Sequence, residues 1–543
     1  MQILLYLKLI LSIISLFFIG YLPVYFLLLK DNNPALQFRN IAGRFFIFFI
    51  SFYIGIFISS VYLMVLSLLG FKYNLLHIIL FSLIFFIFSL YFLITKEIRI
   101  VKSGNSKKPN NPENSVQNNA SLFNSNNIGR LFNDKNINKV ETGSDSKFKS
   151  KFSNKSTNIF NRVVFLILIF LTTFNFLVVL FFALLFPIRF WDAISCWSLK
   201  GRAFFIDKSI IPFYTNHQYQ FSHLSYPLYL PLTQTWIYLW LGRINENLVK
   251  IIFPIFYLSV LFIFYYLFRK RFNKIITMAL VFVFSALPVV MDHGYIEYTN
   301  LLYSIIFAMA VFFFFVSLTL KSTGGKERLK YLMLAAIFFT ILAYIRSEGM
   351  LFLILFLAIN FIIHIIFLIK KPQNSIKAFY KSSLINILVP IFLSFLLMLP
   401  WIILKARLDI PVFSTEWVPI LQNGITSSKI TGSNAFNIAE ASGSLSSELL
   451  FSSFDSTRAF LGSSYGVVWI ILFFIFILNI KKLMIEFKWI FFIFIIFGFI
   501  TLFFSLGLVE DFNWSTDRYI LHILPLTYLW IFYNLPVWYE RKY

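Results

Sequence analysis

Residues 163–187 read VVFLILIFLTTFNFLVVLFFALLFP, an almost uninterrupted apolar run that is long enough to cross a lipid bilayer as one helix. Runs of this kind recur along the chain, in which 59% of the residues are hydrophobic and 13% are charged, and the mean hydropathy is +0.79. Soluble globular proteins contain about twice that share of charged residues. The sequence therefore predicts an all-α, polytopic helical membrane protein with outer-face loops and juxtamembrane helices.

Segments with the roughly 20 apolar residues that a bilayer crossing needs predict about thirteen membrane helices. They are residues 3–29, 44–70, 74–95, 163–187, 246–268, 275–291, 299–318, 331–346, 349–369, 383–404, 464–480, 487–506 and 518–536. The short loops between them are rich in Lys and Arg, as in KKLMIEFK at 481–488, which is typical of cytoplasmic loops. We therefore attribute the net charge of +24 to topology and to attraction by anionic membrane lipids, and not to nucleic acid.

The predicted parts of the chain are a three-helix N-terminal membrane segment (1–95), a disordered cytoplasmic Asn/Ser/Lys-rich linker (96–162), a membrane module (163–404) with a first outer loop (188–245), an outer loop (405–463) and C-terminal membrane helices (464–543). The stretch YPLYLPLTQTWIYLWLG at 226–242 is short, contains prolines and is rich in Trp and Tyr. We expect it to be an interfacial or re-entrant element. If it crossed the membrane, the basic loop at 269–274 would face outside.

The first candidate for chemistry is Asp192, in FPIRFWDAISCWSLKGRAFF at 186–205, directly after the apolar run. The flanking Trp191 and Trp197 are expected to anchor at the membrane interface while the carboxylate faces a cavity. An ordinary ion pair between Asp192 and Arg189 or Lys200 explains the same pattern equally well.

Three further places set ionisable residues next to apolar helices, where they are costly unless they are paired or face a water-filled cavity. Glu297 lies in VVMDHGYIEYTNLL at 289–302, with a solvated loop as the alternative. Arg346 and Glu348 lie in AYIRSEGMLF at 343–352, where a local ion pair is favoured over direct chemistry. Arg518 and His522 lie one helical turn apart in DFNWSTDRYILHILP at 511–525, and Arg suits bidentate phosphate binding.

Metal and cofactor chemistry has little support in the sequence. His217 and His223, in YTNHQYQFSHLSYPLYLP, are spaced as a conceivable metal pair, but no third ligand matches them. The single cysteine, Cys196, excludes an intrachain disulfide framework and a multi-cysteine metal site. Walker-type loops and nucleophile elbows are absent from the sequence. We therefore predict no cofactor and leave a divalent-metal requirement open.

Residues 163–536 resemble the bacterial members of the glycosyltransferase C superfamily, which includes protein O-mannosyltransferases and the aminoarabinose transferases that modify lipid A. The stretches that carry the resemblance are FPIRFWDAISCWSLKGRAFF, HLSYPLYLPL, GYIEYTNLLY and WSTDRYILHILP, in this order and all expected on the outer side. Two positions depart from the pattern. Ala193 follows Asp192 where protein O-mannosyltransferases resemble one another through an Asp-Glu pair, and Glu297 replaces the more usual Asp.

The resemblance implies an inverting transfer of a sugar from a polyprenyl-phosphate donor to a lipid, glycan or protein acceptor, on the extracytoplasmic face of the inner or plasma membrane. Asp192 would be the general base, and Glu297 would position acceptor or donor. The residues that would hold the lipid phosphate or substrate are Arg518, Arg346 and His522, with Lys200, Glu348 and His223 as further candidates.

Two other functions remain open from the sequence. A transporter or flippase of lipid-linked sugars would place acids near the membrane midplane and show internal repeats. A polymerase or ligase of surface polysaccharide would use the same donor on the same face.

Overall fold

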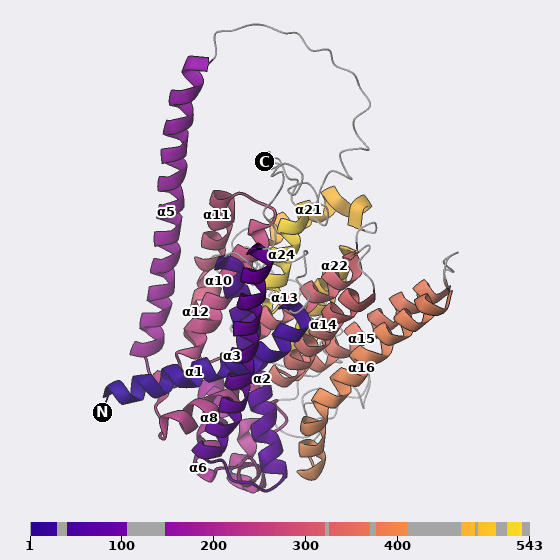
Figure 1. Cartoon of the computed structure of the whole chain (residues 1–543). Helices are drawn as coiled ribbons and strands as arrows, with labels where there is room; N and C mark the ends of the chain where they lie inside the picture. Colours follow the sequence, from indigo (N-terminus) through magenta and orange to yellow (C-terminus); the bar gives the residue numbers. More distant parts are fainter. Residues whose placement is uncertain are drawn as a thin grey trace, which may run out of the picture.

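The computed structural model describes residues 2–29, 41–105, 147–320, 325–369, 376–410, 468–483, 487–506 and 518–534. These residues form helices joined by turns and short loops, with no strand among them (Figure 1). The helices are α1 (Gln2–Val24), η1 (Tyr25–Leu29), α2 (Ile41–Leu68), α3 (Leu75–Asn105), α5 (Lys147–Leu185), η2 (Ala193–Ser198), α6 (Leu199–Asp207), α7 (Ile211–Thr215), η3 (His217–Ser222), α8 (Tyr229–Leu241), α9 (Glu246–Val249), α10 (Ile252–Arg269), α11 (Lys274–Ser285), α12 (Pro288–Asp292), α13 (Asn300–Thr319), α14 (Gly325–Ile345), α15 (Glu348–Ile369), α16 (Ile376–Arg407), α21 (Val468–Leu483), α22 (Trp489–Leu506) and α24 (Leu524–Asn534).

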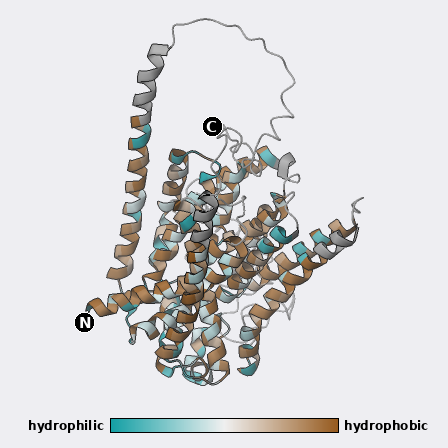
Figure 2. Cartoon of the chain, viewed as in Figure 1, coloured by the Kyte–Doolittle hydropathy of each residue, from teal (hydrophilic) through white to brown (hydrophobic). Residues whose placement is uncertain are grey.

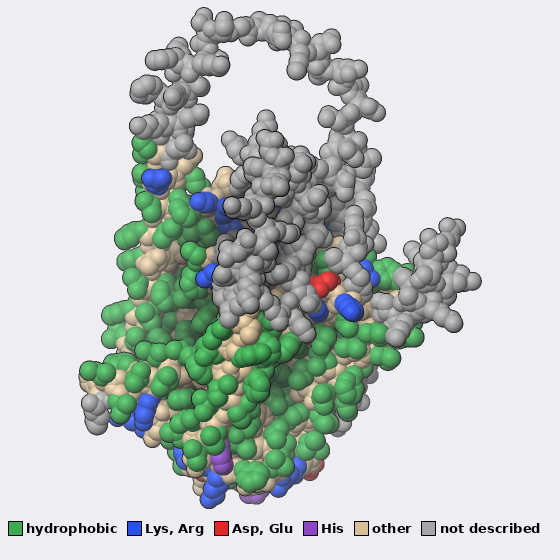
Figure 3. Space-filling view, in the orientation of Figure 1, with side chains coloured by type: hydrophobic (Ala, Val, Ile, Leu, Met, Phe, Trp, Pro, Cys, Tyr) green, Lys and Arg blue, Asp and Glu red, His purple; other side chains and the backbone are tan. Residues whose placement is uncertain are grey.

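Nine helical segments within the described ranges are long and apolar enough to cross a membrane. They are Gln2–Leu29, Ile41–Leu68, Leu75–Thr95, Ile159–Leu185, Glu246–Arg269, Asn300–Thr319, Lys326–Ile345, Glu348–Ile369 and Ser383–Arg407. The all-helical, multi-pass membrane character predicted from the sequence is confirmed for this part of the chain. Hydrophobic residues make up most of the helices (Figure 2), and hydrophobic side chains cover most of the described surface visible in Figure 3.

The remaining four of the thirteen expected crossings are shorter or interrupted helices. The expected helix at 275–291 ends at Ser285, after 12 residues, and α12 begins only at Pro288. The break follows from Pro288, because a residue before proline avoids the helical region, and Leu287 is extended (φ −66°, ψ 122°). In the C-terminal region the apolar helices Val468–Asn479 and Trp489–Thr501 and the helix α24 are also short.

The linker predicted to be disordered at 96–162 is helical at both ends, which corrects the sequence prediction. Helix α3 continues to Asn105 and α5 already begins at Lys147. Extending an existing helix adds one hydrogen bond for each residue that is fixed, so an apolar helix can propagate into a polar flank. Residues 106–146, most of the outer loop at 405–463 and the loop at 508–517 lie outside the described residues.

The stretch at 226–242 forms α8, whose 13 residues are too few to cross the bilayer. It packs against α1, α2 and α6 and is almost wholly buried in protein. Trp236 is completely buried and donates its Nε1 hydrogen to Ser15 Oγ on α1, at 3.2 Å. The expectation that its tryptophans mark the membrane interface is therefore wrong for Trp236.

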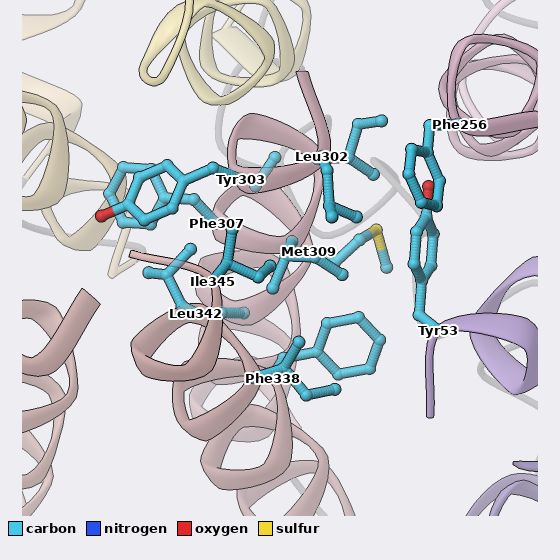
Figure 4. Close-up of a cluster of buried hydrophobic side chains, with 14 of the residues drawn as sticks. Tyr53, Phe256, Leu302, Tyr303, Phe307, Met309, Phe338, Leu342 and Ile345 are labelled. Carbon is cyan, nitrogen blue, oxygen red and sulfur yellow. The ribbon is translucent and has the colours of Figure 1, made fainter. Parts of the chain in front are cut away.

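The N-terminal helices pack directly on the membrane module. Helix α2 contacts α8 and α10, and the Tyr53 hydroxyl of α2 is hydrogen-bonded to Ser259 of α10. The Tyr53 ring stacks on Phe256, with ring centroids 5.9 Å apart (Figure 4). Beside this pair, α13 is buried along its whole span and packs on α14. Residues 1–95 and 163–404 are thus not separate packing units.

Helices α1 and α2 touch through their backbones at Gly20 and Gly55. A Cβ atom added at Gly55 would lie 1.7 Å from Leu16 O, and one added at Gly20 would lie 1.8 Å from Ser51 O. Small residues allow this close approach, which is a common basis of helix packing in membranes. The pair fixes the position of the N-terminal helices.

We expect Gly55→Ala to destabilise the protein by about 2 kcal/mol, because the new methyl group must push the two helices apart. The measurement is thermal unfolding in mild detergent. Val65→Ile, which adds one carbon at a half-buried position of the same helix, is the control and should change little. An unchanged melting temperature for Gly55→Ala would show that the helices separate without cost.

Several segments meet at the end of the bundle that carries the first loop. The Tyr73 amide, in the turn between α2 and α3, donates to Lys208 O at 2.8 Å, and the Ile210 amide donates to Ser67 Oγ at 3.1 Å. Arg407, at the end of α16, donates to Leu68 O at 2.6 Å. The helices α6 and α8 and this end of α16 lie together at the bottom of Figure 1.

Candidate functional site

Asp192 and Arg518 form an ion pair across 326 residues of sequence. Arg518 donates through an NH group to Asp192 Oδ2 at 2.6 Å, and the two side chains are 18% and 39% exposed. Asp192 lies in the first turn of the helix that begins at Trp191, directly after Phe190, whose φ of 71° is a left-handed conformation that is uncommon for a non-glycine residue. The partner of the predicted acid is therefore Arg518, and not Arg189 or Lys200 as in the alternative explanation.

This ion pair lines a small, partly open cavity. The residues around it are Asp192, Trp197, Tyr226, Tyr298, Asn300, Arg346, Arg518 and Tyr519. Trp197 is 2% exposed and stacks on Tyr226, so the prediction that it anchors at the interface is wrong. Trp191 is 67% exposed, and its position agrees with an interfacial role.

Arg346 is the second cation of the cavity, and its predicted ion pair with Glu348 is confirmed at 3.1 Å. Its guanidinium also donates to Asn300 Oδ1 and to the Tyr519 hydroxyl, at 3.3 Å in both cases. Arg346 directly follows the last residue of α14, while Glu348 is the first residue of α15. The Glu348 carboxylate thus neutralises the charge of Arg346. It also lies at a helix N-terminus, where the helix dipole stabilises negative charge.

Asn300 connects Arg346 to two histidines and fixes the protonation of one of them. Arginine only donates, so the Asn300 atom that faces Arg346 is the oxygen, which also accepts from His522 Nε2 at 3.2 Å. The Asn300 amide nitrogen then donates to His293 Nε2 at 3.1 Å, and His293 Nδ1 donates to Val289 O. His293, which accepts at Nε2 and donates at Nδ1, is therefore neutral. Burial lowers the pKa of His293 to about 4, in agreement with this assignment.

Lys200 and His223 do not line the cavity, but both contact Tyr226, which does. Lys200 is fully buried and donates to His223 O at 2.8 Å, and burial lowers the pKa of Lys200 to about 7. The His223 ring stacks on Tyr226, which lines the cavity, with centroids 4.8 Å apart. Both residues therefore reach the cavity through Tyr226.

His217 and His223, whose spacing made a metal pair conceivable although none is predicted, acquire no third ligand within the described part of the chain. His217 is exposed and is hydrogen-bonded to Gln220 at 3.2 Å. Within the described ranges, no three His, Cys, Asp or Glu side chains are close enough to hold a metal ion. Cys196, which is buried in η2, contacts Ser195 at 3.4 Å.

Glu297 does not line the cavity, although its neighbour Tyr298 does. It is buried and paired with Lys250 at 3.5 Å, and Lys250 also donates to Phe186 O at the end of α5. Burial raises the pKa of Glu297 to about 7, while Lys250 and Arg189 oppose that rise. The pair ties the end of α5 to the loop that carries Tyr298 and Asn300.

Sequence reasoning missed four uncharged residues of the cavity, which are Tyr226, Tyr298, Asn300 and Tyr519. Each lies in the same motif as a predicted charged or histidine residue, one to three positions away from it. A tyrosine or asparagine close to an ionisable residue near the start of a helix could have indicated them. A buried charged group needs hydrogen-bond partners, and such polar side chains can supply them.

The comparisons with known proteins add no identification: no family model, curated protein or solved structure matches this chain.

Proposed function

We propose that the protein is a membrane glycosyltransferase that moves a sugar from a polyprenyl-phosphate donor to a lipid, glycan or protein acceptor on the extracytoplasmic face of the inner or plasma membrane. The observation that carries the proposal is one cavity that holds a carboxylate, Asp192, beside two guanidinium groups, Arg518 and Arg346. A proton acceptor and phosphate-binding cations within one small space are what such a transfer requires.

The proposed reaction is a displacement at the anomeric carbon. The acceptor hydroxyl oxygen attacks this carbon while Asp192 takes the hydroxyl proton, and the bond from the anomeric carbon to the phosphate oxygen breaks. The polyprenyl phosphate leaves with the bonding electron pair, and Arg518 and Arg346 neutralise its charge. Attack opposite the leaving group inverts the anomeric configuration.

The contact between Asp192 and Arg518 suggests an order of events. Before a donor binds, Arg518 holds the Asp192 carboxylate through a charge-assisted hydrogen bond. When a donor phosphate binds Arg518, it competes with the carboxylate for the same N–H groups. Asp192 is then released toward the acceptor, and base and phosphate come to lie on opposite faces of the sugar.

The other predicted residues take supporting roles in this proposal. His522 fixes Asn300, which orients Arg346. Lys200 and His223 support Tyr226. Glu297, which is paired with Lys250 outside the cavity, becomes a positioning residue for the Tyr298 loop and not a group that touches substrate.

The arrangement of acids favours transfer over transport. Asp192 lies in the short helix after the span Ile159–Leu185, Glu297 lies in a loop, and Glu348 and Glu246 begin helices. These carboxylates therefore lie outside the spans or at their ends, and not at their centres. A transporter would use ionisable groups near the midplane. A polysaccharide polymerase or ligase shares the proposed donor chemistry and differs only in its acceptor.

The direct test supplies membranes that contain the protein with a polyprenyl-phosphate sugar labelled in the sugar, together with endogenous acceptors. We expect label to move into a lipid, glycan or protein fraction and to require the protein. Label that crosses the bilayer while still attached to the polyprenyl phosphate, with no product formed, would contradict the proposal and indicate transport.

A further inference from the structure

Lys250 connects three separate parts of the fold from a buried position. It lies in the turn between α9 and α10, and its side chain is 1% exposed. Its ammonium group donates to Phe186 O and pairs with Glu297 Oε1 at 3.5 Å. Lysine is rarely buried to this degree without partners. The two partners show what Lys250 holds, which is the end of α5 on one side and the loop between α12 and α13 on the other.

The contact with Phe186 fixes the segment that leads to Asp192. Helix α5 ends at Leu185, and the last carbonyl groups of a helix have no partner within the helix. A cation at this end is also favoured by the helix dipole. The Lys250 ammonium supplies the missing partner, so the chain leaves α5 at a fixed point. Asp192 follows six residues after Phe186.

The contact with Glu297 fixes the side chain on which Arg518 rests. Tyr298 follows Glu297 directly and is 4% exposed. The guanidinium carbon of Arg518 lies 5.2 Å from the centre of the Tyr298 ring, which is the geometry of a cation–π contact. Arg518 in turn donates to Asp192 Oδ2 at 2.6 Å. A continuous path of contacts therefore leads from Lys250 to Arg518.

The rest of this loop is held against α5 and α10 by apolar packing. A Cβ atom added at Gly294 would lie 2.8 Å from Val179 Cγ1 of α5 and 3.1 Å from Tyr257 Cδ2 of α10. The Tyr295 ring packs on Phe182 of α5, with centroids 5.5 Å apart. Apolar burial has no preferred direction, whereas hydrogen bonds do. Packing therefore sets how close the loop lies, and the polar contacts of Lys250 set its orientation.

The buried pair is better explained by orientation than by stability. Taking two charges out of water is costly, and well-packed apolar side chains of similar volume are often as stabilising or more so. Lys250 and Glu297 are 1% and 3% exposed, so solvent does little to reduce this cost. The pair adds what apolar side chains lack, which is a fixed direction between α5, α10 and the loop.

We propose that Lys250 is a positioning residue that sets Asp192 and Arg518 relative to each other. It holds the segment before Asp192 through Phe186, and it holds the support of Arg518 through Glu297. Lys250 itself does not line the cavity. Its role in transfer rests on the proposed function, whereas its effect on phosphate binding by Arg518 does not.

The test compares variants that should move stability and transfer in opposite directions. Lys250→Met with Glu297→Met replaces the pair by apolar side chains of similar size, so the melting temperature in detergent should stay at or above the wild-type value. The directional contacts are lost in this variant. We expect kcat/KM for the donor to fall about a hundredfold, the effect of a displacement of about 1 Å at a reacting centre.

Glu297→Gln should behave in the opposite way. It keeps an oxygen that accepts from Lys250 but removes the charge, so the buried cation loses its counter-ion and the melting temperature should fall. The orientation is kept, and kcat/KM per amount of folded protein should change only slightly. A purely structural role predicts the reverse, with transfer lost where stability is lost.

Lys330→Met with Glu327→Met is the matched control. These two residues form an ion pair within α14, at 2.9 Å, and neither lines the cavity. This variant should transfer sugar as the wild type does. Wild-type transfer by the double methionine variant at 250 and 297, or a loss of transfer in Glu297→Gln as large as in that variant, would overturn the positioning role.

A binding measurement separates this inference from the proposed function. Farnesyl phosphate should raise the melting temperature of the wild type, because a ligand that binds the folded state stabilises it. The double methionine variant at 250 and 297 should bind it about tenfold more weakly, the effect of one lost hydrogen bond to a charged group.

The combined outcomes distinguish the two proposals. If transfer fails in the wild type but farnesyl phosphate binding depends on the pair, Lys250 positions Arg518 and the glycosyltransferase proposal fails. If the wild type and the double methionine variant transfer equally well, the proposed function stands and the role of Lys250 is wrong. A wild type that neither transfers sugar nor binds farnesyl phosphate would contradict both.

Discussion

Replacing Asp192 with asparagine is expected to slow sugar transfer by about a thousandfold, because a positioned general base contributes roughly 10²- to 10⁴-fold to such a reaction. Asparagine has nearly the same shape and keeps an oxygen that can accept the hydrogen bond from Arg518. It cannot take a proton at neutral pH. The measurement is the initial rate of label transfer at saturating donor.

The fold should survive this substitution. Asp192 is 39% exposed, and ion pairs of this exposure stabilise a protein by at most about 1 kcal/mol. Asp207→Asn, a change of the same size in a half-exposed acid of the same loop, is the matched control and should transfer normally. Equal rates for wild type and Asp192→Asn, at equal amounts of folded protein, would rule out Asp192 as the base.

The membrane helices could be predicted because each is a local property of the sequence. Runs such as 163–187 and 299–318 exceed the length of the bilayer core, and the structure has helices there. The break at Leu287 was also readable, since Pro288 stands within the expected helix. The helical ends of the 96–162 linker were not predicted. The Asn/Ser/Lys-rich composition characterises the segment as a whole, and it does not indicate the residue at which a neighbouring helix ends.

The site was predictable in its charged members but not in its pairing. Hydropathy marks Asp192 and Arg518 as unusual, yet no local pattern shows that residues 326 positions apart will touch. The partner of Glu297 could not be predicted either. Glu297 pairs with Lys250 outside the cavity, and no local pattern links these two residues. Asn300 was missed because its importance comes only from the Arg346, His293 and His522 side chains that converge on it.

Arg346→Met is expected to destabilise the protein by about 3 to 5 kcal/mol, since it leaves the Glu348 carboxylate buried without its cation. Arg346 and Glu348 are 13% and 11% exposed, so solvent does little to replace the lost partner. Arg202→Met is the matched control. Its pair with Glu246 is 30% and 33% exposed, and we expect a loss below about 1 kcal/mol. Thermal unfolding in detergent compares the two variants.

The double variant Arg346→Met with Glu348→Gln separates stability from chemistry. The neutral amide removes the buried charge, so most of the lost stability should return, as happens when both members of a buried pair are replaced. Transfer should not return, because the cation proposed to neutralise the leaving phosphate is still missing. A double variant that regains both stability and wild-type transfer would show that Arg346 contributes only to the stability of the fold. Among the described residues, Arg518 would then be the one cation still proposed to bind the phosphate.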